Sequence, residues 1–276
     1  MPAPPFVTLP NGRQAQARET ILVYGDSDVG KTFQYLKLAD WHQRRGSDAR
    51  FFGICTPGND WTKFFLPGAE FEHLANVHFE NATVIQDYFD VYDKVIKRAR
   101  PKSHDWLNVD VLGDSWGAAQ EEYAEREWGT DLGSKWATEG GRYPIGGADW
   151  PWGSINSRHK AFAQNRVIRF PGHLYCCAWD RAPGEKDDKD KLGQATFGMI
   201  GRWPVGQKDE YRRFDTVIHL SFNGRHERVA RTAKERGGRR RLGEVVQRGK
   251  AEPIHVGEPI NDLFKDYLLK IARWKP

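Results

Sequence analysis

The sequence predicts an α/β protein built on a doubly wound, mainly parallel β-sheet. Short apolar runs alternate along the chain with longer stretches in which apolar residues recur at helical spacing. Strands that alternate with helices are typical of a parallel sheet with helices on both faces. A chain of 276 residues is long enough for one large domain of this kind with a substantial core.

The composition is that of a soluble globular protein, with 29% charged and 39% hydrophobic residues. No run approaches the roughly 18 apolar residues of a membrane span, and residues 1–10 lack the basic and apolar regions of a signal peptide. The three cysteines, Cys55, Cys176 and Cys177, lie in apolar runs and form no zinc-binding spacing. We therefore expect a reduced, cytoplasmic protein without membrane contact.

The first half of the chain predicts an arm followed by alternating strands and helices. Residues 1–18 contain four prolines and are expected to form a flexible arm. Strands are expected at residues 20–24, 49–55, 76–79 and 106–113. Helices are expected at residues 31–45, 85–100 and 115–128. Pro101 ends the second of these helices, because proline cannot continue one.

The second half of the chain is interrupted by polar and glycine-rich segments. Residues 129–152 predict an insertion or long loop, residues 181–194 a mobile loop of alternating charge, and residues 223–241 a basic hairpin with its turn at Asn223-Gly224. A helix is expected at 154–166, strands at 174–179, 195–200 and 216–222, and a last helix at 260–274. The predicted domain spans residues 19–250, and residues 251–276 carry the last helix.

A phosphate-binding motif follows the first strand of the domain. The segment matches G-x-x-x-x-G-K-[ST] and consists of Gly25, Asp26, Ser27, Asp28, Val29, Gly30, Lys31 and Thr32. A strand precedes it and a helix follows, which is the context that the motif requires. Its backbone N–H groups and the helix N-terminus would surround phosphates, Lys31 would reach the β- and γ-phosphates, and the Thr32 hydroxyl would bind magnesium. The predicted ligands are ATP and Mg²⁺.

Such a site needs a further carboxylate on the magnesium side, at the end of a neighbouring buried strand. Asp114 follows the apolar residues 109–113 and is the leading candidate for this role. A helix cap is the alternative role for Asp114. Asp110 shares a strand face with Asp114, but it is expected to lie too deep within the strand to reach the metal.

Positive charge is concentrated late in the chain. Residues 225–250 contain ten Lys or Arg against three Asp or Glu, whereas the whole chain has a net charge of +5. This concentration predicts an anionic partner at one place on the surface. The arginines Arg239, Arg240 and Arg241 are the candidates for contact with a nucleic-acid backbone. A solvated surface hairpin is the alternative.

The order of these segments resembles phage-encoded RecA-core ATPases. The resemblance covers roughly residues 19–240 and includes the P-loop, the Val-Leu-Gly-Asp-Ser segment at 111–115, the apolar strand at 174–179, and residues 214–220 and 232–237. It implies a RecA-like homo-oligomer that assists DNA recombination, annealing or replication, with single-stranded DNA as the favoured partner, in the host cytoplasm. It also implies that Lys234 and Arg236 contact the nucleotide of a neighbouring subunit.

The sequence departs from that family where hydrolysis is concerned. A glutamate that orients the attacking water usually follows the second strand, but residues 56–60 contain none. Asp60 or Glu80 would have to replace it, or the enzyme would be slow without a partner. Arg181, just beyond the strand at 174–179, is the candidate sensor of the γ-phosphate.

Other functions remain open at this point. A DNA-packaging or helicase-loading motor would share the same core, a small-molecule or nucleotide kinase would use residues 181–191 as a lid, and a nucleotide-binding scaffold would need no catalytic glutamate. The tryptophans Trp136, Trp150 and Trp152 would either stack on bases or pack within a loop.

Overall fold

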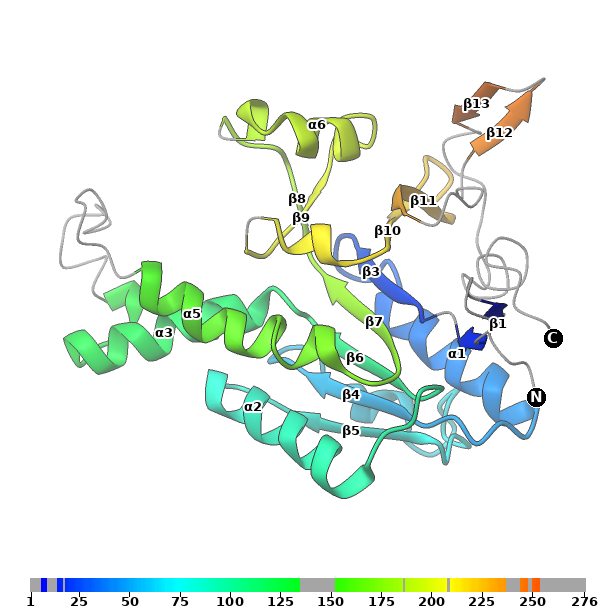
Figure 1. Ribbon diagram of the computed structural model, residues 1–276, viewed down its shortest axis with the longest axis horizontal. Coiled ribbons are helices and arrows are strands. Elements are labelled where there is room, and N and C mark those ends of the chain that lie inside the picture. Colours follow the sequence, from blue (N-terminus) through cyan, green and yellow to red (C-terminus); the bar gives the residue numbers. More distant parts are fainter. Residues whose placement is uncertain are drawn as a thin grey trace.

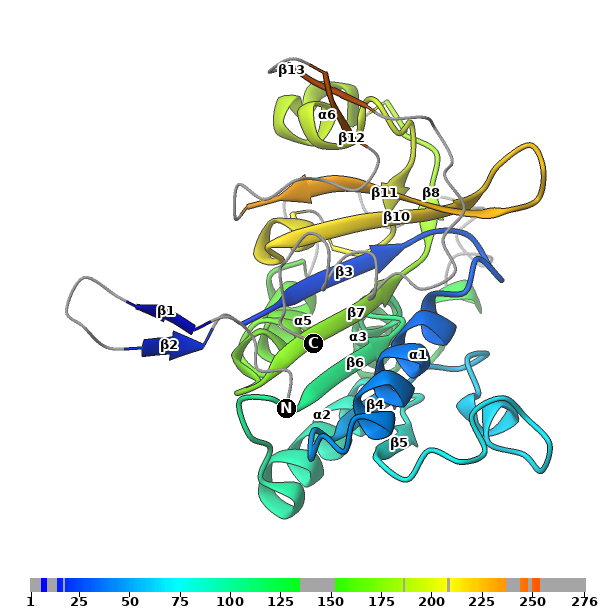
Figure 2. The same cartoon turned by 90° about the vertical axis from the view of Figure 1, so that its right-hand side faces the viewer.

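The protein is described by a computed structural model, shown in Figures 1 and 2. The structure describes residues 6–8, 14–16, 18–134, 152–185, 187–207, 209–236, 244–247 and 250–253. The predicted helix at 260–274 and most of the predicted insertion at 129–152 lie outside these residues. Among the described residues, no helix is long and apolar enough to cross a membrane.

A seven-stranded sheet forms the centre of the molecule, in the order β11-β10-β3-β7-β6-β4-β5. All neighbours are parallel except β10 and β11, which form an antiparallel hairpin. The strands are β3 (Thr20–Tyr24), β4 (Phe51–Cys55), β5 (Val77–Asn81), β6 (Trp106–Asp110), β7 (His173–Ala178), β10 (Thr216–Phe222) and β11 (Arg228–Glu235). The predicted α/β fold with a mainly parallel sheet is confirmed.

Helices cover both faces of this sheet (Figure 2). Helix α1 (Lys31–Arg44) packs on one face, and α2 (Ile85–Lys94), α3 (Asp114–Trp128) and α5 (Trp152–Ala163) pack on the other. Along β3, Ile21 and Val23 face the α1 side, whereas Leu22 and Tyr24 face the opposite side. A strand buried on both faces explains why the sequence there is continuously apolar rather than alternating.

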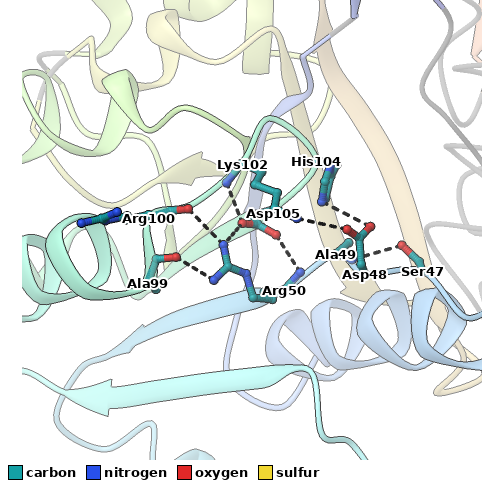
Figure 3. Close-up of polar contacts among 9 residues, drawn as sticks. All are labelled: Ser47, Asp48, Ala49, Arg50, Ala99, Arg100, Lys102, His104 and Asp105. Atoms are coloured by element: carbon teal, nitrogen blue, oxygen red, sulfur yellow. Dashed lines mark hydrogen bonds and ion pairs between the residues drawn. The ribbon is translucent and has the colours of Figure 1, made fainter.

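A buried carboxylate anchors the amino-terminal edge of the sheet (Figure 3). Asp105, just before β6, accepts hydrogen bonds from the Arg50 backbone N–H at 2.8 Å, the Arg50 guanidinium at 2.7 Å and the Lys102 N–H at 2.7 Å. The Arg50 guanidinium also donates to the Ala99 carbonyl at 2.7 Å. These hydrogen bonds link the start of β4 to the chain just before β6.

A small lobe lies between β7 and β10, where the sequence predicts a mobile loop and a strand. It contains β8 (Asp180–Arg181), a 3₁₀ turn (Asp187–Lys189), α6 (Lys191–Phe197) and β9 (Trp203–Pro204). The predicted strand at 195–200 is therefore wrong. The Asp190 side chain caps α6 by accepting from the Gly193 N–H at 3.0 Å, which starts a helix despite the β-prone residues that follow.

Further differences concern additional strand pairs and the ends of elements. Strands β1 (Phe6–Thr8) and β2 (Gln14–Gln16) pair within the predicted arm. Helix α2 continues as a wider π-helical turn over Val95–Ala99. The strand predicted at 106–113 ends at Asp110, because the chain leaves the sheet there and turns into α3. Strands β12 (Glu244–Gln247) and β13 (Lys250–Pro253) form a separate pair.

Candidate functional site: the P-loop and its surroundings

Residues 25–32 link the carboxyl end of β3 to the first turn of α1, as the motif requires. At Gly25, an added Cβ would lie 2.2 Å from the Leu220 carbonyl oxygen, so only glycine fits beside β10. Gly30 has a φ of 89°, a conformation that glycine adopts at little cost. The two motif glycines are thus required by the neighbouring strand and by the turn itself.

Lys31 is buried at the centre of the loop, with 6% of its surface exposed. Its ammonium donates to the carbonyls of Gly25 at 2.9 Å and Asp26 at 2.7 Å, and it lies 4.2 Å from the centre of the Trp179 ring. Burial lowers the pKa of Lys31 from its ordinary value. The loop therefore holds a desolvated positive charge in a defined position.

The Thr32 hydroxyl donates a hydrogen bond to a carboxylate oxygen of Asp110, the last residue of β6. The Trp61 indole donates to the same oxygen at 2.9 Å, and Asp110 is 1% exposed. Gly53 on β4 makes room for this indole, because a Cβ there would lie 2.5 Å from the Trp61 ring. The loop hydroxyl and the acidic side chain thus meet across 78 residues of sequence.

Asp114 lies elsewhere, which corrects the expected placement. It is the first residue of α3, and its carboxylate accepts from the Thr56 hydroxyl at 2.7 Å and from the Trp179 side chain. Burial raises the pKa of Asp114 above its ordinary value. The expectation failed because β6 ends at Asp110, so Asp110 occupies the edge position assigned to Asp114. Gly113, rather than Asp114, is the N-cap residue of α3.

A cavity of about 320 Å³ opens beside the loop. The segment after β4, the end of β6, Trp179 and the start of β11 form its other walls. The residues that line it are Ser27, Asp28, Gly30, Lys31, Thr32, Phe33, Gly58, Asn59, Asp60, Trp61, Lys63, Phe64, Asp110, Trp179 and Arg228. Figure 2 shows the β3–α1 loop and the β10–β11 turn at the same end of the sheet.

Asp60 reaches this cavity, but its carboxylate already has a structural partner. It caps the 3₁₀ helix Trp61–Phe64 by accepting from the Thr62 N–H at 2.9 Å. Hydrogen bonds from Thr62 hold the pKa of Asp60 below its ordinary value. Asp60 is therefore an ionised cavity residue that also serves as a helix cap.

Two other candidates do not line this cavity. Glu80 forms an ion pair with Lys94 and is not part of the cavity lining. Arg181 forms a two-pronged contact with Asp187, at 2.5 and 2.9 Å, within the small lobe. Arg181 therefore pairs with Asp187 in this structure, and its role as a phosphate sensor stays a prediction.

Lys234 and Arg236 lie on β11 and just after it, toward the amino-terminal end of β3. The Lys234 ammonium donates to the carbonyls of Tyr211 at 3.2 Å, Arg212 at 2.9 Å and Phe214 at 2.5 Å. Burial lowers the pKa of Lys234 to about 8. Arg236 pairs with Asp215 at 3.2 Å. Within one subunit, both side chains have partners outside the P-loop, and neither lines its cavity.

Sequence reasoning missed three residues of the site: Trp61, Trp179 and Arg228. Trp61 and Trp179 could have been suspected, since each follows closely on a strand end. Nothing in the sequence distinguishes Arg228 from the other basic residues of 225–250. The candidates Arg239, Arg240 and Arg241 lie outside the described residues, and their role stays a prediction.

The donors around Thr32 suit magnesium, which prefers oxygen ligands and usually keeps one or two carboxylates beside water and phosphate. A threonine hydroxyl in contact with a buried carboxylate supplies that set. Comparison with known proteins adds no further assignment, since neither a protein-family model nor a curated protein matches the chain.

Proposed function

We propose that this protein is a P-loop ATPase that binds ATP with Mg²⁺ at residues 25–32. The observation that carries the proposal is the contact between Thr32 and Asp110, beside the buried ammonium of Lys31. If the motif matched by chance, there would be no reason for a carboxylate at the end of a nearby strand to contact the motif threonine. Here the loop, the strand end and the cavity coincide.

Each residue of the site has a part in this proposal. The loop N–H groups and the amino end of α1 would bind the phosphates, and Lys31 would neutralise charge on the β- and γ-phosphates. Thr32 and Asp110 would hold the magnesium ion, which supplies charge neutralisation at the phosphates. Trp61 would orient the Asp110 carboxylate through its N–H. Since Asp60 is partly occupied as a cap, we propose that hydrolysis is slow without a partner.

The proposal is tested by titrating the purified protein with ATP in the presence of Mg²⁺ and measuring the affinity by calorimetry. We expect Lys31→Ala to weaken ATP binding by about 10- to 100-fold, because a charge-assisted hydrogen bond is worth roughly 1.5–3 kcal/mol. Arg44→Ala, at the exposed far end of the same helix, is the control and should bind like the parent. A parent protein that binds no nucleotide would overturn the proposal.

We further propose that the ATPase is of the RecA-like type, forms a homo-oligomer and acts on single-stranded DNA. The order of sequence segments supports this, and the mostly parallel sheet is compatible with it. The basic residues 225–250 provide the charge for a phosphate backbone. Because Lys234 and Arg236 already have internal partners, the contacts would come from the other basic residues, such as Arg239, Arg240 and Arg241.

Replacing Arg239, Arg240 and Arg241 by Ala is expected to weaken binding of single-stranded DNA and to flatten its salt dependence. Loss of three phosphate contacts should reduce the slope of log affinity against log salt by about 2, at roughly 0.7 per contact. Fluorescence anisotropy of a labelled oligonucleotide over a salt series measures this slope. An unchanged slope would mean that these three arginines do not contact DNA. ATP binding by the triple variant shows that it is folded.

A further inference from the structure

Arg228 stands directly beside the P-loop, although it is almost 200 residues away in sequence. It is the first residue of β11, and its Nε, Cδ and Cζ atoms lie 3.2, 3.5 and 3.6 Å from where a Cβ on Gly30 would be. Its guanidinium also lies 5.8 Å from the centre of the Phe33 ring and lines the cavity. Gly30 thus leaves the space that this side chain occupies.

The turn before β11 determines this position. Asn223 accepts from the N–H groups of Arg225 at 2.9 Å and Glu227 at 3.0 Å through its side-chain oxygen, and it donates its own N–H to the Glu227 carbonyl at 2.9 Å. Phe222 and Arg228 are then paired across the hairpin, beyond the end of β3. The side chain is therefore presented by a hydrogen-bonded turn on a central sheet.

Arg228 also brings a positive charge to the wall of the cavity. Within the described part of the chain, no carboxylate forms an ion pair with Arg228, although the guanidinium faces a cavity. Arginine binds phosphate strongly because its planar group can donate two parallel hydrogen bonds.

We propose that Arg228 binds the α- and β-phosphates of the nucleotide in the same subunit. The proposal rests on the ATPase function proposed above. The Lys31 ammonium contacts Gly25, Asp26 and Trp179, and the Thr32 hydroxyl contacts Asp110. These contacts mark the side of the loop on which the γ-phosphate and the metal would lie. Arg228 lies at Gly30 and Phe33 instead, on the flank where the loop surrounds the inner phosphates.

The test compares ATP and ADP binding to the full chain by calorimetry. Arg228→Ala should weaken both ligands by the same factor, about 10- to 30-fold, because both carry the two inner phosphates. Arg228→Lys should recover only part of the affinity, since an ammonium cannot donate in the same two-pronged way.

Arg169→Ala is the matched control, since Arg169 is exposed and does not line the cavity. Melting temperatures of all variants verify that they fold. Parent-like affinities in Arg228→Ala would overturn the inference, and so would a loss for ATP with none for ADP. If Lys31→Ala still loses ATP binding in either case, the ATPase proposal stands. If the parent binds neither nucleotide, that proposal fails as well.

Discussion

Replacing Asp110 by Asn is expected to lower magnesium-dependent ATP hydrolysis by about 100-fold, because substitutions at metal sites typically cost 10- to 100-fold or more in affinity or activity. The amide oxygen can still accept the hydrogen bonds of Thr32 and Trp61, so the local packing should survive. The negative charge that holds the ion is lost, however. Hydrolysis measured over a magnesium titration should show a rightward shift together with the lower rate.

Asp114→Asn is the matched control for this change. Its carboxylate contacts Thr56 and Trp179 rather than Thr32, and its removal should alter hydrolysis by no more than about threefold. The reverse result, in which Asp114→Asn abolishes turnover and Asp110→Asn does not, would restore the assignment made from sequence. Both variants make the same change from Asp to Asn, four residues apart, so a difference in their activity must come from where each carboxylate lies.

Replacing Glu210 by Gln is expected to remove a loss of stability at alkaline pH. Glu210 is 9% exposed, and Nε2 of the buried His159 lies 3.5 Å from Glu210 Oε1. Burial raises the pKa of Glu210 to about 8. Between pH 4.5 and 8 the native state therefore holds a proton that the unfolded chain releases, so stability falls as pH rises.

Ionisation of Glu210 should by itself lower the free energy of unfolding by about 1.4 kcal/mol per pH unit, or about 2 kcal/mol between pH 6.5 and 8. Urea unfolding at a series of pH values measures it. Glu210→Gln cannot ionise, so the stability of the parent relative to this variant should fall by about 2 kcal/mol over that interval. Glu70→Gln, at an exposed site, should keep the pH profile of the parent. A difference between parent and Glu210→Gln that stays constant from pH 6.5 to 8 would contradict the expected protonation of Glu210.

Below pH 6.5 the buried histidines act in the opposite direction. Burial lowers the pKa of His159 to about 4 and the pKa values of His42 and His173 to about 3. The unfolded chain binds protons there that the native state does not, so stability falls as pH decreases from 6.5. Three such histidines outweigh the single glutamate at low pH, and the parent should be most stable near pH 7.

The sequence alone predicted the features that lie within one continuous segment. The motif at residues 25–32, the strand before it and the helix after it are as predicted, because eight adjacent residues define the loop and its two flanks. The buried strands β7 and β10 were also predicted, since a strand covered on both faces must be apolar along its length.

Only the tertiary structure decided which distant residues meet that segment. Whether Asp110 or Asp114 reaches Thr32 depends on the residue at which β6 leaves the sheet, and a local apolar pattern does not specify that point. The Trp61 indole reaches Asp110 because Gly53 leaves room for it, and Arg228 reaches Gly30 because a hairpin returns the chain to the loop. Such contacts depend on sheet register and packing, which act between residues that are far apart in the chain.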